Sequence, residues 1–78
     1  MSELMLFTTS TCPKCPEATK WMKEHYPNTK IMIADEDDMA MQLAHRYNIM
    51  CVPAIVEVNV DNSFIISSFD RYKNKGEN

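Results

Sequence analysis

The order of its apolar segments constrains this chain more than any other feature. Four short apolar runs predict β-strands, at residues 4–8, 30–34, 54–58 and 63–69. Apolar residues that recur every three or four positions predict helices at residues 13–26 and 35–47. The predicted order is β-α-β-α-β-β. A turn at Asp61-Asn62 makes the last two strands antiparallel, whereas each β-α-β crossover should make parallel neighbours of the strands that it joins.

Composition places the chain among small globular proteins. Its 78 residues allow one domain, and its 45% hydrophobic and 24% charged residues exclude a collagen-like or disordered chain. We therefore expect an α/β fold in which helices pack on a four-stranded mixed sheet, as a single domain over residues 1–70. Residues 71–78 are polar, and we expect them to form a frayed tail.

Charge and hydropathy exclude some functions. The net charge of −3 argues against a general nucleic-acid binder. No apolar run approaches the ~20 residues that a membrane-spanning helix needs, so we expect no membrane partner. The first residues, Met1-Ser2-Glu3, have neither the basic nor the apolar stretch of a secretory signal, and we expect a cytoplasmic protein.

The helix patterns also predict which residues are buried. In the first helix, Pro13 suits the first turn and Glu17 suits the positive end of the helix dipole. The inward face of this helix comprises Cys15, Ala18, Met22 and Tyr26. Asp35 is the expected N-cap of the second helix, whose inward face comprises Ala40, Leu43, Ala44 and Tyr47. The helical methionines Met22, Met39 and Met41 are expected to fill the core.

Two of the three cysteines lie close together. Cys12 and Cys15 enclose Pro13-Lys14 at the start of the first helix, and Cys51 lies far along the chain. An odd number of cysteines in a short chain argues against a disulfide framework. The Cys-x-x-Cys spacing instead indicates either thiol redox chemistry or half of a metal site. Redox chemistry suits the context, because a helix N-terminus stabilises the negative charge of a thiolate.

A dithiol that opens a helix directly after a first strand resembles the thioredoxin superfamily. That superfamily places a cis-proline just before its third strand, facing the dithiol, and Val52-Pro53 lies at the matching position here. The Cys-Pro-x-Cys form and the short length resemble glutaredoxins and glutaredoxin-like small redoxins. The resemblance covers residues 3–69. It implies a thioredoxin-like fold in which the last helix is absent or vestigial.

The resemblance implies a thiol–disulfide oxidoreductase that reduces protein disulfides and uses no metal or cofactor. Cys12 would be the attacking nucleophile and Cys15 the resolving thiol. The implied substrate-binding residues surround the dithiol and the cis-proline; they are Thr11, Pro13, Lys14, Val52 and Pro53. A substrate strand could pair with the backbone edge at Val52.

The electron donor implied by the resemblance is either glutathione or a reductase. Glutaredoxins carry a Gly-Gly pair that helps to seat glutathione, and residues 64–70 contain no glycine. A carboxylate of glutathione needs backbone N–H groups or a well-placed Lys or Arg to offset its desolvation. We therefore expect the electron donor to be a protein reductase. We also expect this chain to act as a monomer.

Two functions of other classes compete with this one. A metal-binding module would join Cys12 and Cys15 with Cys51 or a histidine around zinc or an iron–sulfur cluster, although structural zinc usually takes two close pairs of ligands. A redox-inactive interaction domain is disfavoured because both cysteines are intact. Cys51 itself is expected to be a small buried residue, since free cysteines are among the most buried residue types.

Overall fold

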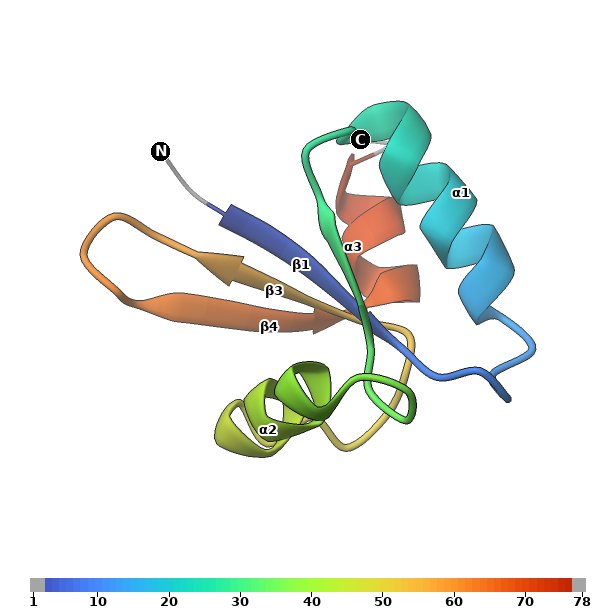
Figure 1. Ribbon diagram of the computed structural model, residues 1–78. Helices are drawn as coiled ribbons and strands as arrows, with labels where there is room; N and C mark the ends of the chain where they lie inside the picture. Colours follow the sequence, from blue (N-terminus) through green and yellow to red (C-terminus); the bar gives the residue numbers. More distant parts are fainter. Residues whose placement is uncertain (1–2, 77–78) are drawn as a thin grey trace.

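The computed structural model describes residues 3–76, with side chains as far as Asn74. Its elements are β1 (Glu3–Thr8), α1 (Cys15–His25), β2 (Lys30–Ile33), α2 (Asp38–Arg46), β3 (Ala54–Val58), β4 (Phe64–Ser68) and α3 (Phe69–Gly76). Helices cover both faces of one sheet (Figure 1). Within the described residues, no helix has the length and apolar content to cross a membrane.

β1 lies inside the sheet, whose strand order is β2-β1-β3-β4. It runs parallel to β2, with Met5 opposite Lys30, and antiparallel to β3, with Phe7 opposite Ala54. β3 and β4 form an antiparallel hairpin. The predicted mixed sheet, its first parallel crossover and its final hairpin are therefore confirmed.

The connection after α2 sets the direction of β3. Asn48 follows the helix with a φ of 54°, in the left-handed region that asparagine tolerates at a helix end. The chain then returns to the end of the sheet where β1 finishes, and Ala54 pairs with Phe7 (Figure 1). β3 must run away from that end. The prediction that the second crossover makes parallel neighbours is therefore wrong, because β3 pairs with β1 in the opposite direction.

An apolar cluster lies on each face of the sheet. On the face covered by α1 and α3, the buried cluster comprises Leu6, Ala18, Met22, Ile55 and Phe69. On the other face it comprises Met5, Phe7 and Val56, against which Leu43, Ala44 and Tyr47 of the α2 region pack. Leu6 and Phe7 are both fully buried, because successive side chains of a strand point to opposite faces and both faces are covered.

The start of α2 differs from the prediction. The helix begins at Asp38, and its N-cap is Asp37, whose carboxylate accepts a hydrogen bond from the backbone N–H of Met39 at 3.0 Å. The predicted cap, Asp35, is wrong because its carboxylate is bound to Ser10, in the loop after β1.

A third helix, α3, follows β4 directly. The prediction of a frayed tail from residue 71 is wrong as far as residue 76, and residues 77–78 lie outside the described residues. With eight residues, the last helix is reduced rather than absent. Phe69 and Tyr72 of α3 lie edge-on to Trp21 of α1, with ring centroids 5.8 and 6.5 Å apart. These contacts explain the helix, because they bury its apolar face against α1.

Of the helical methionines, only Met22 fills the core. It is 0% exposed, whereas Met39 is 67% exposed and Met41 is 44% exposed. The prediction is wrong for Met39 and Met41 because α2 buries only its Ala40 completely and turns these two side chains toward solvent.

We predict that Met22→Ala lowers the free energy of unfolding by about 2–5 kcal/mol, because it leaves a cavity in the cluster between α1 and the sheet. Met39→Ala is the matched control, and it should change stability by no more than about 0.5 kcal/mol. Urea unfolding followed by Trp21 fluorescence measures both. Equal losses from the two variants would contradict the burial assigned to Met22.

Candidate active site

The dithiol lies in the turn between β1 and α1. The backbone N–H of Cys12 donates to the carbonyl of Thr9 at 3.3 Å, and that of Cys15 donates to the carbonyl of Cys12 at 3.4 Å. α1 begins at Cys15 rather than at the predicted Pro13, with Lys14 as its N-cap, and no side chain caps its first turn. The positive end of the helix dipole therefore lies beside the two sulfurs, where it favours negative charge.

The two sulfurs lie in different environments. Both thiols are free; Cys12 is half-buried, and Cys15 is only 4% exposed. Burial raises the pKa of the Cys15 thiol to about 11, and a hydrogen bond with the Cys12 thiol acts in the same direction. A backbone hydrogen bond with Thr9 has the opposite, smaller effect, and the negative charge of Asp35 adds to the rise. Cys15 is therefore protonated at neutral pH, and Cys12 is the sulfur more accessible to a second molecule.

A hydrogen-bonded pair joins the loop after β1 to the turn after β2. The backbone N–H of Ser10 donates to Oδ1 of Asp35 at 2.9 Å, and its hydroxyl donates to Oδ2. These bonds hold the pKa of Asp35 below its usual range. Sequence reasoning missed this pair, although a signal was present. Because β1 and β2 are parallel, their carboxyl ends lie at the same end of the sheet, and the polar residues that follow the two strands meet there.

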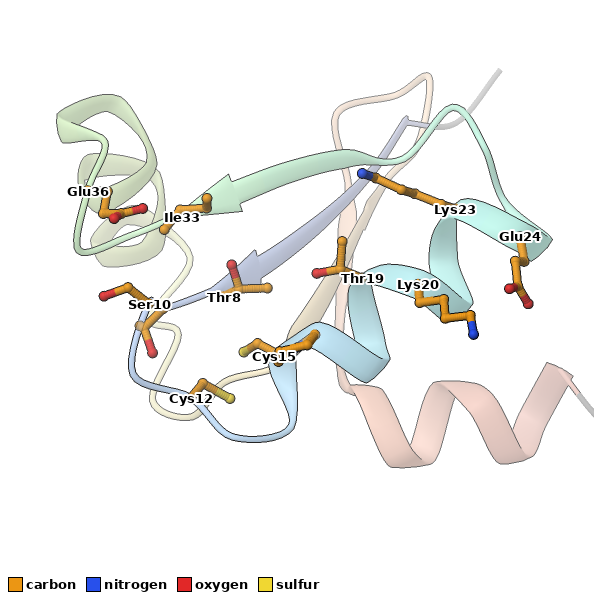
Figure 2. A pocket seen from close by; sticks show the side chains of 12 residues that line it. Thr8, Ser10, Cys12, Cys15, Thr19, Lys20, Lys23, Glu24, Ile33 and Glu36 are labelled. Atoms are coloured by element: carbon orange, nitrogen blue, oxygen red, sulfur yellow. The ribbon is translucent and has the colours of Figure 1, made fainter.

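An open cavity of about 560 Å³ extends from the dithiol along α1. Cys12 and Cys15 lie at one end of it, and Lys20, Lys23 and Glu24 lie at the other (Figure 2). The volume falls within the range of sites that bind small molecules. Sequence reasoning did not find this cavity, because it depends on how α1 lies against the ends of β1 and β2.

The predicted substrate-binding residues lie outside this cavity. Thr11, Pro13 and Lys14 are exposed on the turn, and Val52 and Pro53 are half-buried on a separate loop. The Val52–Pro53 peptide bond is cis, as predicted. Pro53 precedes the first residue of β3, which pairs with the end of β1, so this loop lies at the same end of the sheet as the dithiol turn.

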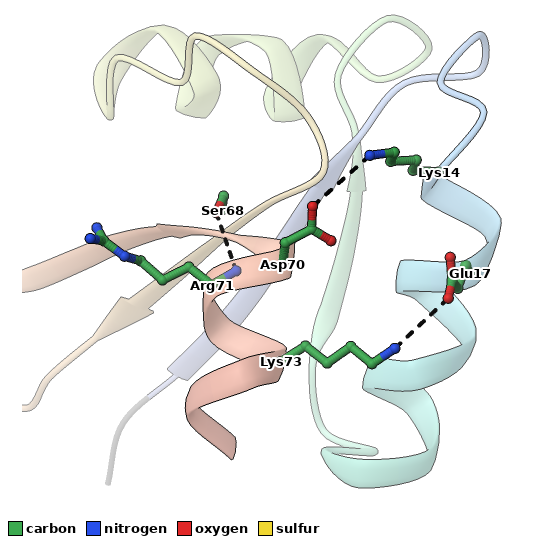
Figure 3. Close-up of polar contacts among 6 residues, drawn as sticks. All are labelled: Lys14, Glu17, Ser68, Asp70, Arg71 and Lys73. Carbon is green, nitrogen blue, oxygen red and sulfur yellow. Dashed lines mark hydrogen bonds and ion pairs between the residues drawn. The ribbon is translucent and has the colours of Figure 1, made fainter. Parts of the chain in front are cut away.

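Ion pairs connect α3 to the start of α1 (Figure 3). Nζ of Lys14 lies 4.0 Å from Oδ2 of Asp70, and Nζ of Lys73 lies 3.8 Å from Oε1 of Glu17. The hydroxyl of Ser68 accepts a hydrogen bond from the backbone N–H of Arg71 at 3.3 Å, which caps α3 (Figure 3). Lys14 and Asp70 are largely exposed, so their pair contributes at most about 1 kcal/mol. It does place a carboxylate beside the one cation within the Cys-Pro-Lys-Cys motif.

Cys51 is exposed, which contradicts the expectation of a small buried residue. The reason is local. The loop that returns from α2 to β3 packs Ile49 and Val52 against the core, and Met50 and Cys51 between them are turned outward. Within residues 3–76, no group of three or more His, Cys, Asp and Glu side chains is arranged to hold a metal ion.

Comparison with known proteins gives a family and a fold. A family model described as Thioredoxin domain matches residues 3–66. None of the curated proteins compared with the chain matches it. Among solved structures, the thioredoxin-like protein BC3987 has a TM-score of 0.67 and 19% identity, over 95% of this chain and 97% of that one.

Two thioredoxins show the same likeness. The Plasmodium falciparum thioredoxin has a TM-score of 0.68 and 14% identity, over 96% of this chain and 66% of that one. Thioredoxin O2 from Arabidopsis thaliana, in its oxidized state, has a TM-score of 0.61 and 15% identity, over 99% of this chain and 73% of that one. At these identities the likeness shows the fold, so the thioredoxin-like fold expected from the sequence is confirmed.

We predict that iodoacetamide labels Cys12 before Cys15 at mildly acidic pH. Cys12 is the more accessible sulfur, and the pKa of about 11 leaves almost no thiolate on Cys15. Labelling of Cys15 should increase about tenfold per pH unit toward that value. Peptide mapping by mass spectrometry, in a Cys51→Ala background, gives both rates. Faster labelling of Cys15 would reverse the assignment of the two sulfurs.

Proposed function

The chain belongs to the thioredoxin-domain family, and we propose that it is a thiol–disulfide oxidoreductase that reduces protein disulfides with Cys12 and Cys15. The observation that carries the proposal is the asymmetry of its two free thiols. Cys12 is half-buried and accessible in the turn before α1, and the pKa of its buried neighbour Cys15 is raised to about 11. This difference suits attack by the accessible sulfur and later resolution by the buried one.

In the proposed reaction, the thiolate of Cys12 attacks one sulfur of a substrate disulfide. A mixed disulfide forms on Cys12, and the other substrate sulfur leaves as a thiolate. Cys15 then loses its proton, and its thiolate attacks Sγ of Cys12. The mixed disulfide breaks and an intramolecular disulfide forms, so two electrons have passed from the protein to the substrate. The raised pKa of Cys15 keeps it protonated until that second step.

The backbone of the loop before β3 supports the proposal that the substrate is a polypeptide. Within residues 3–76, the backbone of Val52 takes part in no backbone hydrogen bond, whereas the carbonyl of Pro53 accepts one from Phe69 at 3.1 Å. An extended substrate segment can therefore use the N–H and carbonyl of Val52 as a strand edge. Thr11, Pro13 and Lys14 border the dithiol on the exposed side of the turn and would contact the same segment.

The structure at the end of β4 supports the proposal that the electron donor is not glutathione. β4 ends at Ser68 and α3 begins at Phe69, so no glycine loop intervenes between them. Lys14, the cation nearest the dithiol in the sequence, already faces the carboxylate of Asp70. We therefore propose that a protein reductase returns electrons to the Cys12–Cys15 disulfide.

We predict that Cys15→Ser nearly abolishes turnover and accumulates a mixed disulfide on Cys12, because no second thiol can resolve the adduct. The measurement is the reduction of a protein disulfide by the pre-reduced protein in a Cys51→Ala background, without and with excess glutathione and glutathione reductase, together with the intact mass of the protein. In the same Cys51→Ala background, Cys12→Ser should be inactive and form no adduct. If Cys15→Ser keeps activity near the unmutated level, glutathione resolves the adduct and the dithiol route is wrong.

We also predict that Cys51→Ala keeps disulfide reductase activity within a few-fold. Cys51 is exposed and lies outside the cavity that contains the dithiol, so its loss removes no group from the proposed reaction. Reduction of a protein disulfide, followed under the same conditions as for Cys15→Ser, gives the comparison. A loss as large as that of Cys12→Ser would instead make Cys51 a functional residue.

A further inference from the structure

The outer edge of β4 is open and apolar. Within the described residues β4 pairs only with β3, so the main-chain groups along its other edge have no strand partner there. Phe64, Ile65 and Ile66 are 47%, 54% and 41% exposed. Proteins usually protect such an edge with a charged residue, a proline or a bulge. Residues 62–69 contain no charge and no proline, and the pairing with β3 is regular, so this edge is suited to pairing with another strand.

A hydrogen bond next to β4 shows which residues present free main-chain groups at that edge. The backbone N–H of Phe69, directly after the strand, donates to the carbonyl of Pro53 at 3.1 Å. Main-chain groups of successive residues point to opposite sides of a strand, so those of the odd-numbered residues of β4 face β3. The N–H and carbonyl groups of Phe64, Ile66 and Ser68 therefore point to the open edge.

The side chains of β4 complement those of a second copy of the same strand. The strand begins with two large apolar residues, Phe64 and Ile65, and ends with two serines. When two copies pair in the antiparallel direction about Ile66, Phe64 lies opposite Ser68 of the second copy. Ile65 lies opposite Ser67, so each of these large side chains faces a small one. A two-fold interface requires a surface that is complementary to itself in this way.

A cavity of about 220 Å³ at the serine end of β4 can receive the ring of Phe64 from the second copy. Ile66 and Ser68 line it, together with Met50, which is 90% exposed. Phe64 lies on the face of the sheet that α2 covers, because its ring centroid is 4.8 Å from that of Tyr47. Side chains two residues apart share a face, so Ile66 and Ser68 lie on it too. A cavity of about 150 Å³ can hold a benzene ring, so this one has room for a phenyl group.

Charges at the two ends of β4 match in the same arrangement. Asp61 precedes the strand and Arg71 follows it, and neither forms an ion pair among the described residues. The carboxylate of Asp61 is bound to Ser63, which is neutral, so its charge is retained. Figure 3 shows the side chain of Arg71 directed away from Lys14 and Asp70. In an antiparallel pair, the Asp61 end of one copy lies beside the Arg71 end of the other, where opposite charges attract.

We propose that two copies of this chain associate through β4, which pairs in the antiparallel direction about Ile66 and joins the two sheets into one. Phe64 of each copy lies at the cavity beside Ser68 of the other, and Asp61 of each copy faces Arg71 of the other. The inference goes beyond the proposed function and does not depend on it, because no residue of β4 lines the cavity that contains the dithiol. A monomer, expected from the sequence, is the alternative that the test distinguishes.

Cysteine cross-linking tests the register. In a Cys12→Ser/Cys15→Ser/Cys51→Ala background, Ile66→Cys should form a disulfide-linked dimer. Its Cα atom lies about 5.5 Å from that of its equivalent in the second copy, a distance that a disulfide favours. Ile65→Cys is the matched control. Its equivalent lies about 7–8 Å away, so it should give at most about a tenth as much dimer. Non-reducing electrophoresis measures the yields, and Trp21 fluorescence confirms that each variant is folded. Equal yields would contradict the register.

Charge reversal tests the contacts at the ends of the strand. We predict that Arg71→Asp and Asp61→Arg each weaken the dimer about tenfold, because like charges then meet at both ends of the strand pair. An equimolar mixture of the two variants should associate as well as the unmutated chain, because both contacts in the mixed dimer again join opposite charges. Lys20→Asp and Glu24→Arg, on α1, change the net charge equally, and neither these variants nor their mixture should change the dissociation constant by more than about twofold.

Sedimentation velocity measures the dissociation constants. Because a single pair of strands makes a small interface, the protein concentration should extend from about 10 μM to about 1 mM. A monomer throughout this range, without a cross-link at Ile66→Cys, overturns the inference and leaves the edge of β4 to a strand of another protein. A dimer that the charge reversals do not weaken forms through another surface, which also overturns it. Neither outcome bears on the proposed function, because that function is tested by the activity of the dithiol.

Discussion

β1 is hydrogen-bonded along both edges, to β2 in the parallel direction and to β3 in the antiparallel direction, and its carboxyl end positions the candidate site. Leu6 and Phe7 anchor it from opposite faces of the sheet, where both are fully buried. Because a shift in the register of β1 would move both side chains out of the clusters that they fill, the turn that carries Cys12 and Cys15 starts from a fixed point. The carboxyl end of β2 and the start of β3 lie on either side of this turn.

Those two neighbours make the surroundings of the dithiol asymmetric. On the β2 side, Asp35 binds Ser10, and the cavity beside α1 opens toward Lys20 and Lys23. On the β3 side, the cis bond at Pro53 precedes the strand, and the edge of Val52 carries no charge. The same pair of sulfurs therefore borders a charged, concave surface and an uncharged backbone edge, which suit ligands of different kinds.

The sequence predicts the parts of this structure that depend on local pattern. Apolar runs locate all four strands, the period of α1 identifies Cys15, Ala18 and Met22 as buried, and the resemblance places the cis-proline. The errors arise where a tertiary contact decides. The turn after Asn48 reverses β3, the ring of Trp21 stabilises a helix that composition describes as a tail, and the packing of Val52 turns Cys51 outward.

The charges around the dithiol show why a motif alone does not define its chemistry. Lys14 lies within the motif, yet α3 brings Oδ2 of Asp70 to 4.0 Å from its ammonium group, so the two opposite charges lie side by side at the turn. Lys20 and Lys23 lie outside the motif, but they line the cavity that ends at Cys12 and Cys15 and form no ion pair among the described residues. The lining of the cavity therefore includes charges of both signs from the later turns of α1, because Glu24 lies there together with the two lysines. The exposed side of the turn instead carries the ion pair of Lys14 and Asp70, so the charges around the dithiol depend on residues of α1 and α3 as well as on the four residues of the motif.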